Sequence, residues 1–107
     1  MISIRKDLSA ANLGNGVTRR VLATGGALMT VEFVFEKGSV GAPHSHHHEQ
    51  VGYVVAGRFA FTLEGVTTVL VAGDSYYVPS GAAHGAEALE DGVLLDVFTP
   101  QREDFLR

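Results

Sequence analysis

The stretch GSVGAPHSHHHEQVGYVVAG, residues 38–57, contains four of the five histidines of the 107-residue chain. In an extended strand, alternate side chains point to the same face. One face would then carry the side chains of His44, His46, His48 and Gln50. The opposite face would carry His47 and Glu49. Two imidazoles that are two residues apart on one face can both reach a single ion at roughly 2.1 Å, so the spacing points to a metal site.

A third ligand of such a site must come from another strand, and His84 is the only histidine outside this stretch. It lies in VPSGAAHGA, residues 78–86, which combines turn residues with the start of a strand. A His-x-His pair standing alone would indicate no more than the polar edge of a strand. This pair follows a proline and is joined by a second block of glycine, proline and histidine. We therefore predict a metal site to which histidines of both blocks contribute.

The rest of the sequence alternates between apolar and polar residues and has almost no helical periodicity. In VEFVF, residues 31–35, and RFAFTL, residues 58–63, the alternation is that of half-buried strands. Turn dipeptides recur about every ten residues; they are Asn15-Gly16, Gly25-Gly26, Glu64-Gly65, Gly73-Asp74, Ser80-Gly81 and Asp91-Gly92. The last of these is predicted to form a two-residue hairpin turn. The pattern predicts one all-β domain, a sandwich or barrel, over residues 1–107.

The C-terminal residues are the one exception to this all-β pattern. Thr99 can cap a helix, Pro100 suits its first position, and QREDFL, residues 101–106, can form one or two turns. We therefore predict a short helix that starts at the Thr99-Pro100 pair.

The composition narrows the classes of function. Apolar residues make up 46% of the chain and charged residues 19%, as in a globular protein. The net charge is −4 and no basic block is present, so neither nucleic acid nor an anionic membrane is an expected partner. Cysteine is absent, which excludes disulfides and thiolate chemistry. The N-terminus lacks the apolar segment of a signal peptide and no apolar run reaches membrane-span length, so we expect a cytoplasmic protein.

An aspartate interrupts the apolar run VLLDVF, residues 93–98, and shares one face of the predicted strand with Leu94 and Phe98. An unpaired buried carboxylate is costly. Asp96 therefore lies on an exposed face or against an arginine, or it points into a cavity with a raised pKa that suits proton transfer. Arg102 either returns over the mouth of that cavity, where its planar guanidinium would bind a substrate carboxylate, or lies in a charged surface tail. The residues alone leave these alternatives open.

The two histidine blocks resemble the two motifs of the cupin superfamily. The first motif, G-x5-H-x-H-x3-E-x6-G, is matched with a glutamine in place of the glutamate, at Gly38, His44, His46, Gln50 and Gly57. The second motif, G-x5-P-x-G-x2-H-x3-N, is matched with an alanine in place of the asparagine, at Gly73, Pro79, Gly81, His84 and Ala88. The resemblance implies a double-stranded β-helix, an antiparallel β-barrel of the jelly-roll type. It also implies metal ligation by His44, His46, Gln50 and His84.

A glutamine at the carboxylate position has chemical consequences. A neutral amide oxygen leaves the full 2+ charge on the ion, which raises its Lewis acidity and argues against oxygen-activating iron chemistry. If the strand had a bulge there, Glu49 would replace Gln50 as the fourth ligand. His48 shares the ligand face but lies outside the motif. We assign it to substrate contact or to support of the ligands, with a solvated histidine as the alternative.

A narrower resemblance covers nearly the whole chain. The segments EKGSVGAPHSHHHEQVGYVVAG, AGDSYYVPSGAAHG and GVLLDVFTPQREDF are similar to those of the KdgF family of pectin-degradation cupins. The resemblance implies conversion of 4,5-unsaturated uronates, released from pectin or alginate, to linear 4-deoxy-5-keto uronates. It implies one bound divalent metal ion, and Zn, Ni, Fe, Mn and Co all suit three imidazoles and an amide. It also places Asp96, Phe98 and Arg102 in the active site, where we assign them proton transfer, the sugar pocket and the substrate carboxylate, respectively.

Other functions also fit these residues. A small cupin can be a sugar-binding module without catalysis, or a metal-dependent dioxygenase or sugar isomerase. Asp96 favours an enzyme because a binding module gains little from a costly buried carboxyl, and Gln50 argues against a dioxygenase. The resemblance further implies a homodimer, and an open sheet edge at residues 1–8 would favour exchange of N-terminal strands between copies.

Overall fold

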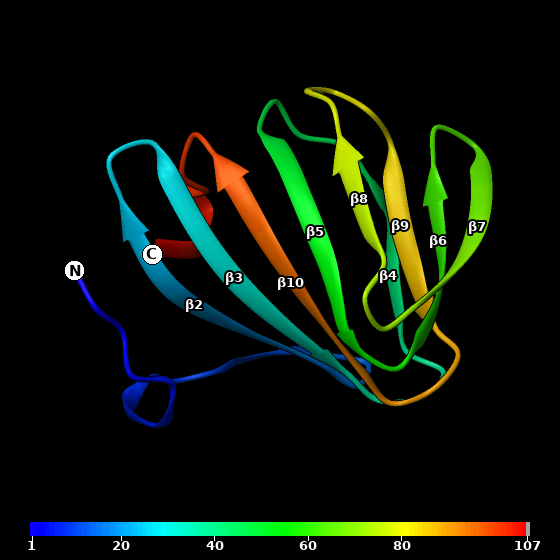
Figure 1. Cartoon of the computed structure of the whole chain (residues 1–107), viewed down its shortest axis with the longest axis horizontal. Helices are drawn as coiled ribbons and strands as arrows, with labels where there is room; N and C mark the ends of the chain where they lie inside the picture. Colours follow the sequence, from blue (N-terminus) through cyan, green and yellow to red (C-terminus); the bar gives the residue numbers. More distant parts are fainter. Residues whose placement is uncertain (107) are drawn as a thin grey trace.

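The computed structural model describes residues 1–106, which form strands with two short 3₁₀ helices at the ends. In chain order the elements are η1 (Arg5–Asp7), β1 (Ala11–Gly14), β2 (Val17–Gly25), β3 (Leu28–Phe35), β4 (Val40–His44), β5 (Glu49–Ala56), β6 (Arg58–Leu63), β7 (Val66–Val71), β8 (Ser75–Val78), β9 (His84–Ala88), β10 (Gly92–Thr99) and η2 (Glu103–Leu106). One antiparallel sheet has the order β1-β2-β3-β10-β5-β8 and the other the order β4-β9-β6-β7 (Figure 1). No helix in the described residues is both long and apolar enough to cross a membrane. The all-β prediction is confirmed.

The two sheets share an apolar core made by the inward-facing residues of their strands. Val54 and Leu94 come from the six-stranded sheet, and Phe59 and Ala88 come from the four-stranded sheet. The rings of Phe35 and Phe59 meet edge to face at 5.2 Å across this core. Such an aromatic pair contributes about 0.5–1.5 kcal/mol beyond the area it buries. A second cluster extends the core below the C-terminal segment, and it consists of Met29, Val31 and Phe98.

Two of the predicted turn dipeptides form tight hairpins. Asn15-Gly16 joins β1 to β2, and its residues have φ of 52° and 81°. Glu64-Gly65 joins β6 to β7, and its residues have φ of 48° and 80°. Two-residue hairpin turns of type I′ require positive φ at both central positions, which asparagine and glycine tolerate well. These two turn predictions are confirmed.

The prediction of a hairpin at Asp91-Gly92 is wrong. β9 pairs with β4 and β6, whereas β10 pairs with β3 and β5, so the chain crosses between the sheets here. Gly92 begins β10, and a Cβ at this position would lie 2.7 Å from the Ala56 carbonyl oxygen and 2.7 Å from ring atoms of Phe59. A glycine is needed here because the chain packs closely where it crosses between the sheets. In the sequence, a glycine needed for close packing looks the same as a glycine needed for a turn.

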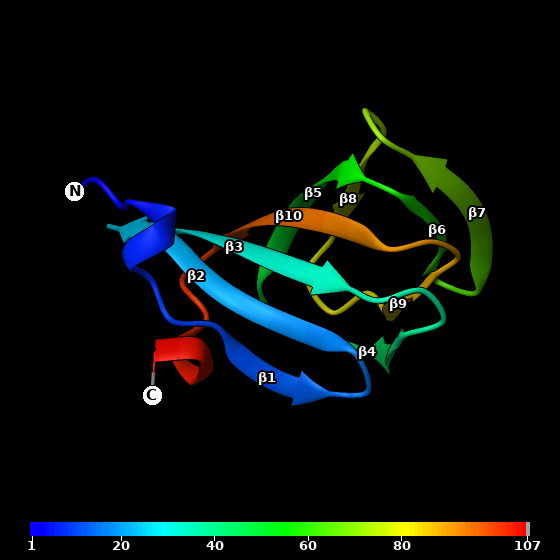
Figure 2. The ribbon, with the colours of Figure 1, turned by 90° about the horizontal axis from the view of Figure 1, so that it is seen from below.

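The C-terminal helix starts later than the sequence predicts. Thr99 is still part of β10, where it pairs with Glu49 of β5, and it therefore cannot cap a helix. The Thr99–Pro100 peptide is cis. Of the residues after β10 that the structure describes, only those of η2 are helical, and the chain turns back beside the six-stranded sheet to reach them (Figure 2). The Arg19 guanidinium of β2 lies 4.1 Å from the centre of the Phe105 ring of η2. The segment after β10 thus folds back onto the six-stranded sheet.

Candidate metal centre and active site

The histidine stretch carries the chain from one sheet to the other instead of forming one strand. β4 ends at His44 in the four-stranded sheet, and β5 begins at Glu49 in the six-stranded sheet. Residues 45–48 connect them. Burial still alternates through this connection, with buried His48 and Gln50 and exposed His47 and Glu49. The periodicity therefore predicts the facing of these side chains correctly, although it does not predict the crossing.

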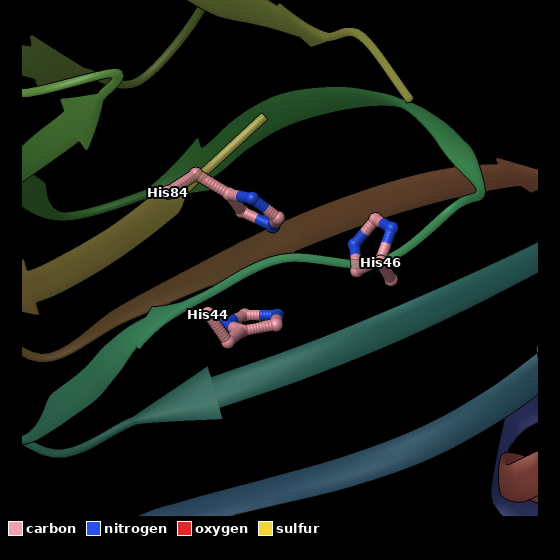
Figure 3. Close-up of side chains that lie close together, drawn as sticks. All are labelled: His44, His46 and His84. Carbon is pink, nitrogen blue, oxygen red and sulfur yellow. The ribbon is translucent and has the colours of Figure 1, made fainter. Parts of the chain in front are cut away.

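Three histidines meet where the chain crosses. His44 ends β4, His46 lies in the connection, and His84 begins β9 directly opposite His44. One ring nitrogen of each lies within 4.8 Å of the others. Figure 3 shows the three imidazoles gathered around a common space, with His44 and His84 on neighbouring strands. This arrangement lets three nitrogens reach one ion.

Backbone carbonyl groups fix the orientation of all three imidazoles. In each ring, Nδ1 lies within hydrogen-bond distance of a carbonyl oxygen two residues away. The distances are 3.1 Å from His44 to Ala42, 2.9 Å from His84 to Ala82 and 3.0 Å from His46 to His48. A carbonyl oxygen only accepts, so we assign the proton of each ring to Nδ1. Each Nε2 then keeps a free lone pair, which is the form that binds a metal ion.

Gln50 turns its side-chain oxygen toward the same cluster. Oε1 lies 3.1 Å from Nε2 of His46, and the side chain is buried at the start of β5. The Gln50 side chain also lies near Asp96, where it acts to lower the pKa of that carboxyl. With the His46 proton on Nδ1, the facing nitrogen and oxygen are both acceptors, and a cation between them satisfies both. Three imidazole nitrogens and one amide oxygen suit a divalent transition metal, so the donor set fits the implied ion.

Glu49 points away from the cluster. Its side chain lies on the exposed face, where its carboxylate accepts a hydrogen bond of 2.6 Å from the Tyr77 hydroxyl. The ladders that join β5 to β10 and β8 have no register shift at Glu49 or Gln50. Without a bulge, the strand has no means of turning Glu49 inward, and Gln50 is the residue that reaches the histidines.

The surroundings of His46 and His84 favour their neutral forms. Burial, followed by the positive charge of Arg102, lowers the pKa of His46 to about 4. Burial also lowers the pKa of His84. Because a metal ion binds the neutral imidazole, these two histidines need to lose no proton at neutral pH before they can bind one.

Asp96 lies beside the histidines on the inner face of β10, where it is only 3% exposed. The Tyr76 hydroxyl donates a hydrogen bond of 2.8 Å to Oδ1. Burial raises the pKa of Asp96 to about 6, against the opposing effects of the Gln50 side chain, the Tyr76 hydroxyl and the Arg102 charge. A carboxyl group whose pKa lies close to neutral pH is suited to giving and taking a proton.

The hydrogen bond between Tyr76 and Asp96 depends on a missing side chain between them. Tyr76, Gly52 and Asp96 form one row across β8, β5 and β10. A Cβ on Gly52 would collide with the ring and hydroxyl of Tyr76. The tyrosine therefore reaches across the middle strand because that strand has a glycine there. The sequence alone did not identify Tyr76, because SYYV has one tyrosine on each face of the strand. The glycine that pairs with Tyr76 is the feature that could have identified it.

A cavity of about 200 Å³ brings these groups together. Apolar and aromatic side chains form much of its wall, and its polar groups converge from both sheets. The functional residues in the wall are His44, Gln50, Tyr76, His84, Asp96 and Phe98. An open-mouthed cavity of this kind, with a few convergent polar groups and a carboxyl of shifted pKa, is typical of a small-molecule site.

Three sequence-predicted residues, His46, His48 and Arg102, lie outside the wall of the cavity. A ring nitrogen of His46 still lies within 4.8 Å of those of His44 and His84. The Arg102 guanidinium lies 5.2 Å from the centre of the Phe98 ring. His48 is buried 6.5 Å from the same ring, and its Nδ1 has no hydrogen-bond partner among the described residues. Its assignment to substrate contact or to support of the ligands stays a prediction.

Comparisons with known proteins agree with this fold. The family model described as "Cupin domain" matches residues 31–98. The pectin degradation protein KdgF of Dickeya dadantii (strain 3937) is 43% identical over 96 residues, which cover 88% of this chain and 87% of that protein.

Two solved structures have closely similar folds. KdgF from Halomonas sp. has a TM-score of 0.93 and 38% identity, covering 98% of this chain and 97% of that chain. An RmlC-like cupin from Shewanella frigidimarina NCIMB 400 has a TM-score of 0.94 and 42% identity, covering 97% of this chain and 94% of that chain. With a family match over more than half of its residues and a KdgF relative matched over most of both chains, this chain belongs to the cupin family and, within it, to the KdgF family.

Proposed function

We propose that this protein is a metal-dependent enzyme that converts 4,5-unsaturated uronates, from pectin or alginate breakdown, to linear 4-deoxy-5-keto uronates. The observation that carries the proposal is the buried Asp96 carboxyl in the same cavity wall as His44, His84 and Gln50. The relatives named KdgF support the substrate class, since one of them is a pectin degradation protein. We infer that one cupin domain over residues 1–107 does this work, in the cytoplasm.

The four donors would hold one divalent ion, and Zn, Ni, Fe, Mn and Co are all compatible with them. These donors are His44, His46, His84 and Gln50. The bound ion would supply Lewis-acid stabilisation of charge on the carboxylate or ring oxygens of the sugar. Because all four donors are neutral, they leave the charge of the ion available to the substrate.

The protein's own residues would move the proton and hold the sugar. C4 gains a proton, the oxygen of water adds to C5, and the bond from C5 to the ring oxygen then breaks. This leaves a ketone at C5 and a hydrated aldehyde at C1, which loses the water. Asp96 is the proton carrier, held in place by the hydroxyl of Tyr76. Phe98 shapes the apolar wall of the pocket, and Arg102 binds the substrate carboxylate.

The direct test is turnover of unsaturated galacturonate, made with a pectate lyase and followed by loss of the enol-ether absorbance. We expect the absorbance to fall with the purified protein, to persist after chelation, and to fall again when a divalent metal is restored. Saturable binding without loss of absorbance would identify a sugar-binding module instead. Oxygen consumption with the sugar would identify a dioxygenase.

We further propose that two copies associate through the outer face of the six-stranded sheet. Exposed apolar side chains gather there on three adjacent strands, at Val51, Tyr53, Val55, Tyr77 and Val97. Val51 lies at the centre, paired with Tyr77 on one side and Val97 on the other. An exposed apolar patch of this kind marks an interaction surface, and a second copy offers the same patch to a two-fold interface.

The N-terminal segment is a second element that would contribute to this interface by exchange. Met1 and Ile2 are 81% and 87% exposed, whereas Arg5 is held to the sheet by an ion pair of 2.9 Å with Glu32. The first residues are therefore free to reach a neighbouring copy while the helix behind them stays in place.

Replacing Val51 with aspartate is expected to halve the molecular mass in solution, measured by light scattering after size-exclusion chromatography. The reason is that a carboxylate at the centre of the interface would be buried without a partner. The matched control is Val66→Asp, a valine that is 67% exposed on β7 of the other sheet, and it should keep the wild-type mass. A monomeric wild-type protein, or a Val51→Asp variant of unchanged mass, would contradict the dimer.

A further inference from the structure

The guanidinium of Arg102 is bound along one edge by a carboxylate two residues further along the chain. Nε donates to Oδ1 of Asp104 at 3.2 Å, and Nη2 donates to Oδ2 at 3.0 Å. This pairing occupies the side edge of the guanidinium. Of its five N–H donors, the two of Nη1 and one of Nη2 take no part in it. A second carboxylate can therefore still bind across Nη1 and Nη2.

Asp104 lies on the solvent side of Arg102. The Arg102 guanidinium is 5.2 Å from the centre of the Phe98 ring, and Phe98 lines the cavity. Asp104 is exposed, whereas Arg102 is half-buried. The edge of the guanidinium that Asp104 binds is therefore the solvent-facing edge, and the free donors of Arg102 lie on its inward side.

The C-terminal turn that carries Asp104 is anchored on the sheet. The Phe105 ring lies between two guanidinium groups, at 4.1 Å from that of Arg19 and 4.2 Å from that of Arg102. Its edge contacts with the rings of Phe33 and Phe98 are at 6.2 Å and 5.9 Å. The backbone N–H of Phe105 also donates to the Arg102 carbonyl at 3.0 Å and closes the turn. These contacts fix Asp104 relative to Arg102.

A second anchor lies just before the turn. The side-chain amide of Gln101 donates a hydrogen bond of 3.0 Å to the carbonyl of Gly26, in the hairpin between β2 and β3. The Arg102 side chain is only 12% exposed, whereas that of Asp104 is 58% exposed. The carboxylate thus holds the arginine from the solvent side, and the arginine faces inward.

We propose that Asp104 is a positioning residue: it holds the Nε and Nη2 edge of Arg102 so that Nη1 and the remaining Nη2 donor face the carboxylate of the substrate. This inference rests on the proposed function, because it needs an anionic substrate in the cavity. If Asp104 instead competed with the substrate carboxylate for Arg102, removal of its charge would lower KM rather than raise it. Kinetics of one variant therefore separates the two.

The test compares the metal-loaded full chain with Asp104→Asn, Asp104→Glu and the control Glu103→Gln. Glu103 is an exposed neighbour with no ion pair among the described residues, so its variant loses the same charge without releasing Arg102. We expect Asp104→Asn to raise KM for unsaturated galacturonate by about tenfold with kcat within about twofold of wild type. Asp104→Glu should recover most of this loss, and Glu103→Gln should match wild type. A KM that is unchanged or lower in Asp104→Asn overturns the inference.

A binding measurement keeps the inference testable if turnover is absent. The probe is saturated D-galacturonate, titrated into the zinc-loaded, ¹⁵N-labelled protein and followed by NMR chemical shifts. Binding about tenfold weaker in Asp104→Asn than in Glu103→Gln supports the role of Asp104 even where the proposed reaction fails. Turnover by wild type with equal binding in both variants overturns the role of Asp104 and leaves the proposed function intact. A wild-type protein that does not bind galacturonate at all overturns it as well.

Discussion

Asparagine in place of Asp96 is expected to lower the turnover of unsaturated galacturonate by about 10²- to 10⁴-fold, the usual contribution of general acid–base catalysis. The asparagine has nearly the same size and can still accept the hydrogen bond that Tyr76 now donates to the carboxylate at 2.8 Å. It cannot carry an acidic proton. The loss should therefore fall on kcat, while metal content and melting temperature stay close to those of wild type.

A graded comparison separates the proton carrier from its support. Tyr76→Phe removes the hydroxyl but keeps the carboxyl and its contact with Gln50. We expect a smaller loss, of about tenfold, because one hydrogen bond to a charged group is removed and the acid remains. If Asp96→Asn retains turnover within about tenfold of wild type with normal metal content, Asp96 is not the proton carrier.

The second large effect is expected on metal binding. Replacing His44 with alanine should lower retained metal from about one ion per chain to a small fraction, since even loss of a residue that only supports a ligand weakens binding by 10- to about 100-fold. His44 lies at the exposed rim of the cluster, so its replacement leaves no buried void. Metal analysis after dialysis of the loaded protein measures the effect. Activity should fall in parallel and recover in part with excess metal.

The control for this variant comes from the same stretch of sequence. His47→Ala removes an exposed histidine whose ring is tilted against that of His48 and lies outside the cluster. It should retain metal as wild type does. Equal retention by the His44 and His47 variants, or failure of the wild-type protein to retain any of the five metals, would contradict the assignment of ligands.

Much of the candidate site follows from strand parity, which needs no structure. In β10 the apolar run with one aspartate places Leu94, Asp96 and Phe98 on one face, and all three are buried in the fold. In the histidine stretch, parity separates Gln50 from Glu49. Parity predicts the facing of side chains in both places because a register shift of one residue would turn every side chain to the opposite face. A strand with one buried face does not allow such a shift.

Parity does not report where the chain leaves one sheet for another. Residues 45–48 alternate as a strand would, although they form a connection, and Gly92 looks like a turn although it packs against Phe59. In both segments the chain crosses from one sheet to the other. Their sequence indicates which side chains are buried, but it does not indicate which strand each segment pairs with. Asp104 escaped sequence reasoning for a different reason: its partner is set by the fold of a turn, not by a repeating pattern.

Position 52 offers a way to sort related sequences. A larger side chain there would leave every candidate metal ligand in place but would push the Tyr76 ring away from Asp96. Chains that share the two histidine motifs would then form two groups, those with a glycine at position 52 and those with a larger residue there. Only the first group retains the hydroxyl that steadies the carboxyl. A single glycine, considered together with the tyrosine and aspartate that it separates, would thus distinguish chains that support the buried carboxyl with a tyrosine hydroxyl from chains that do not.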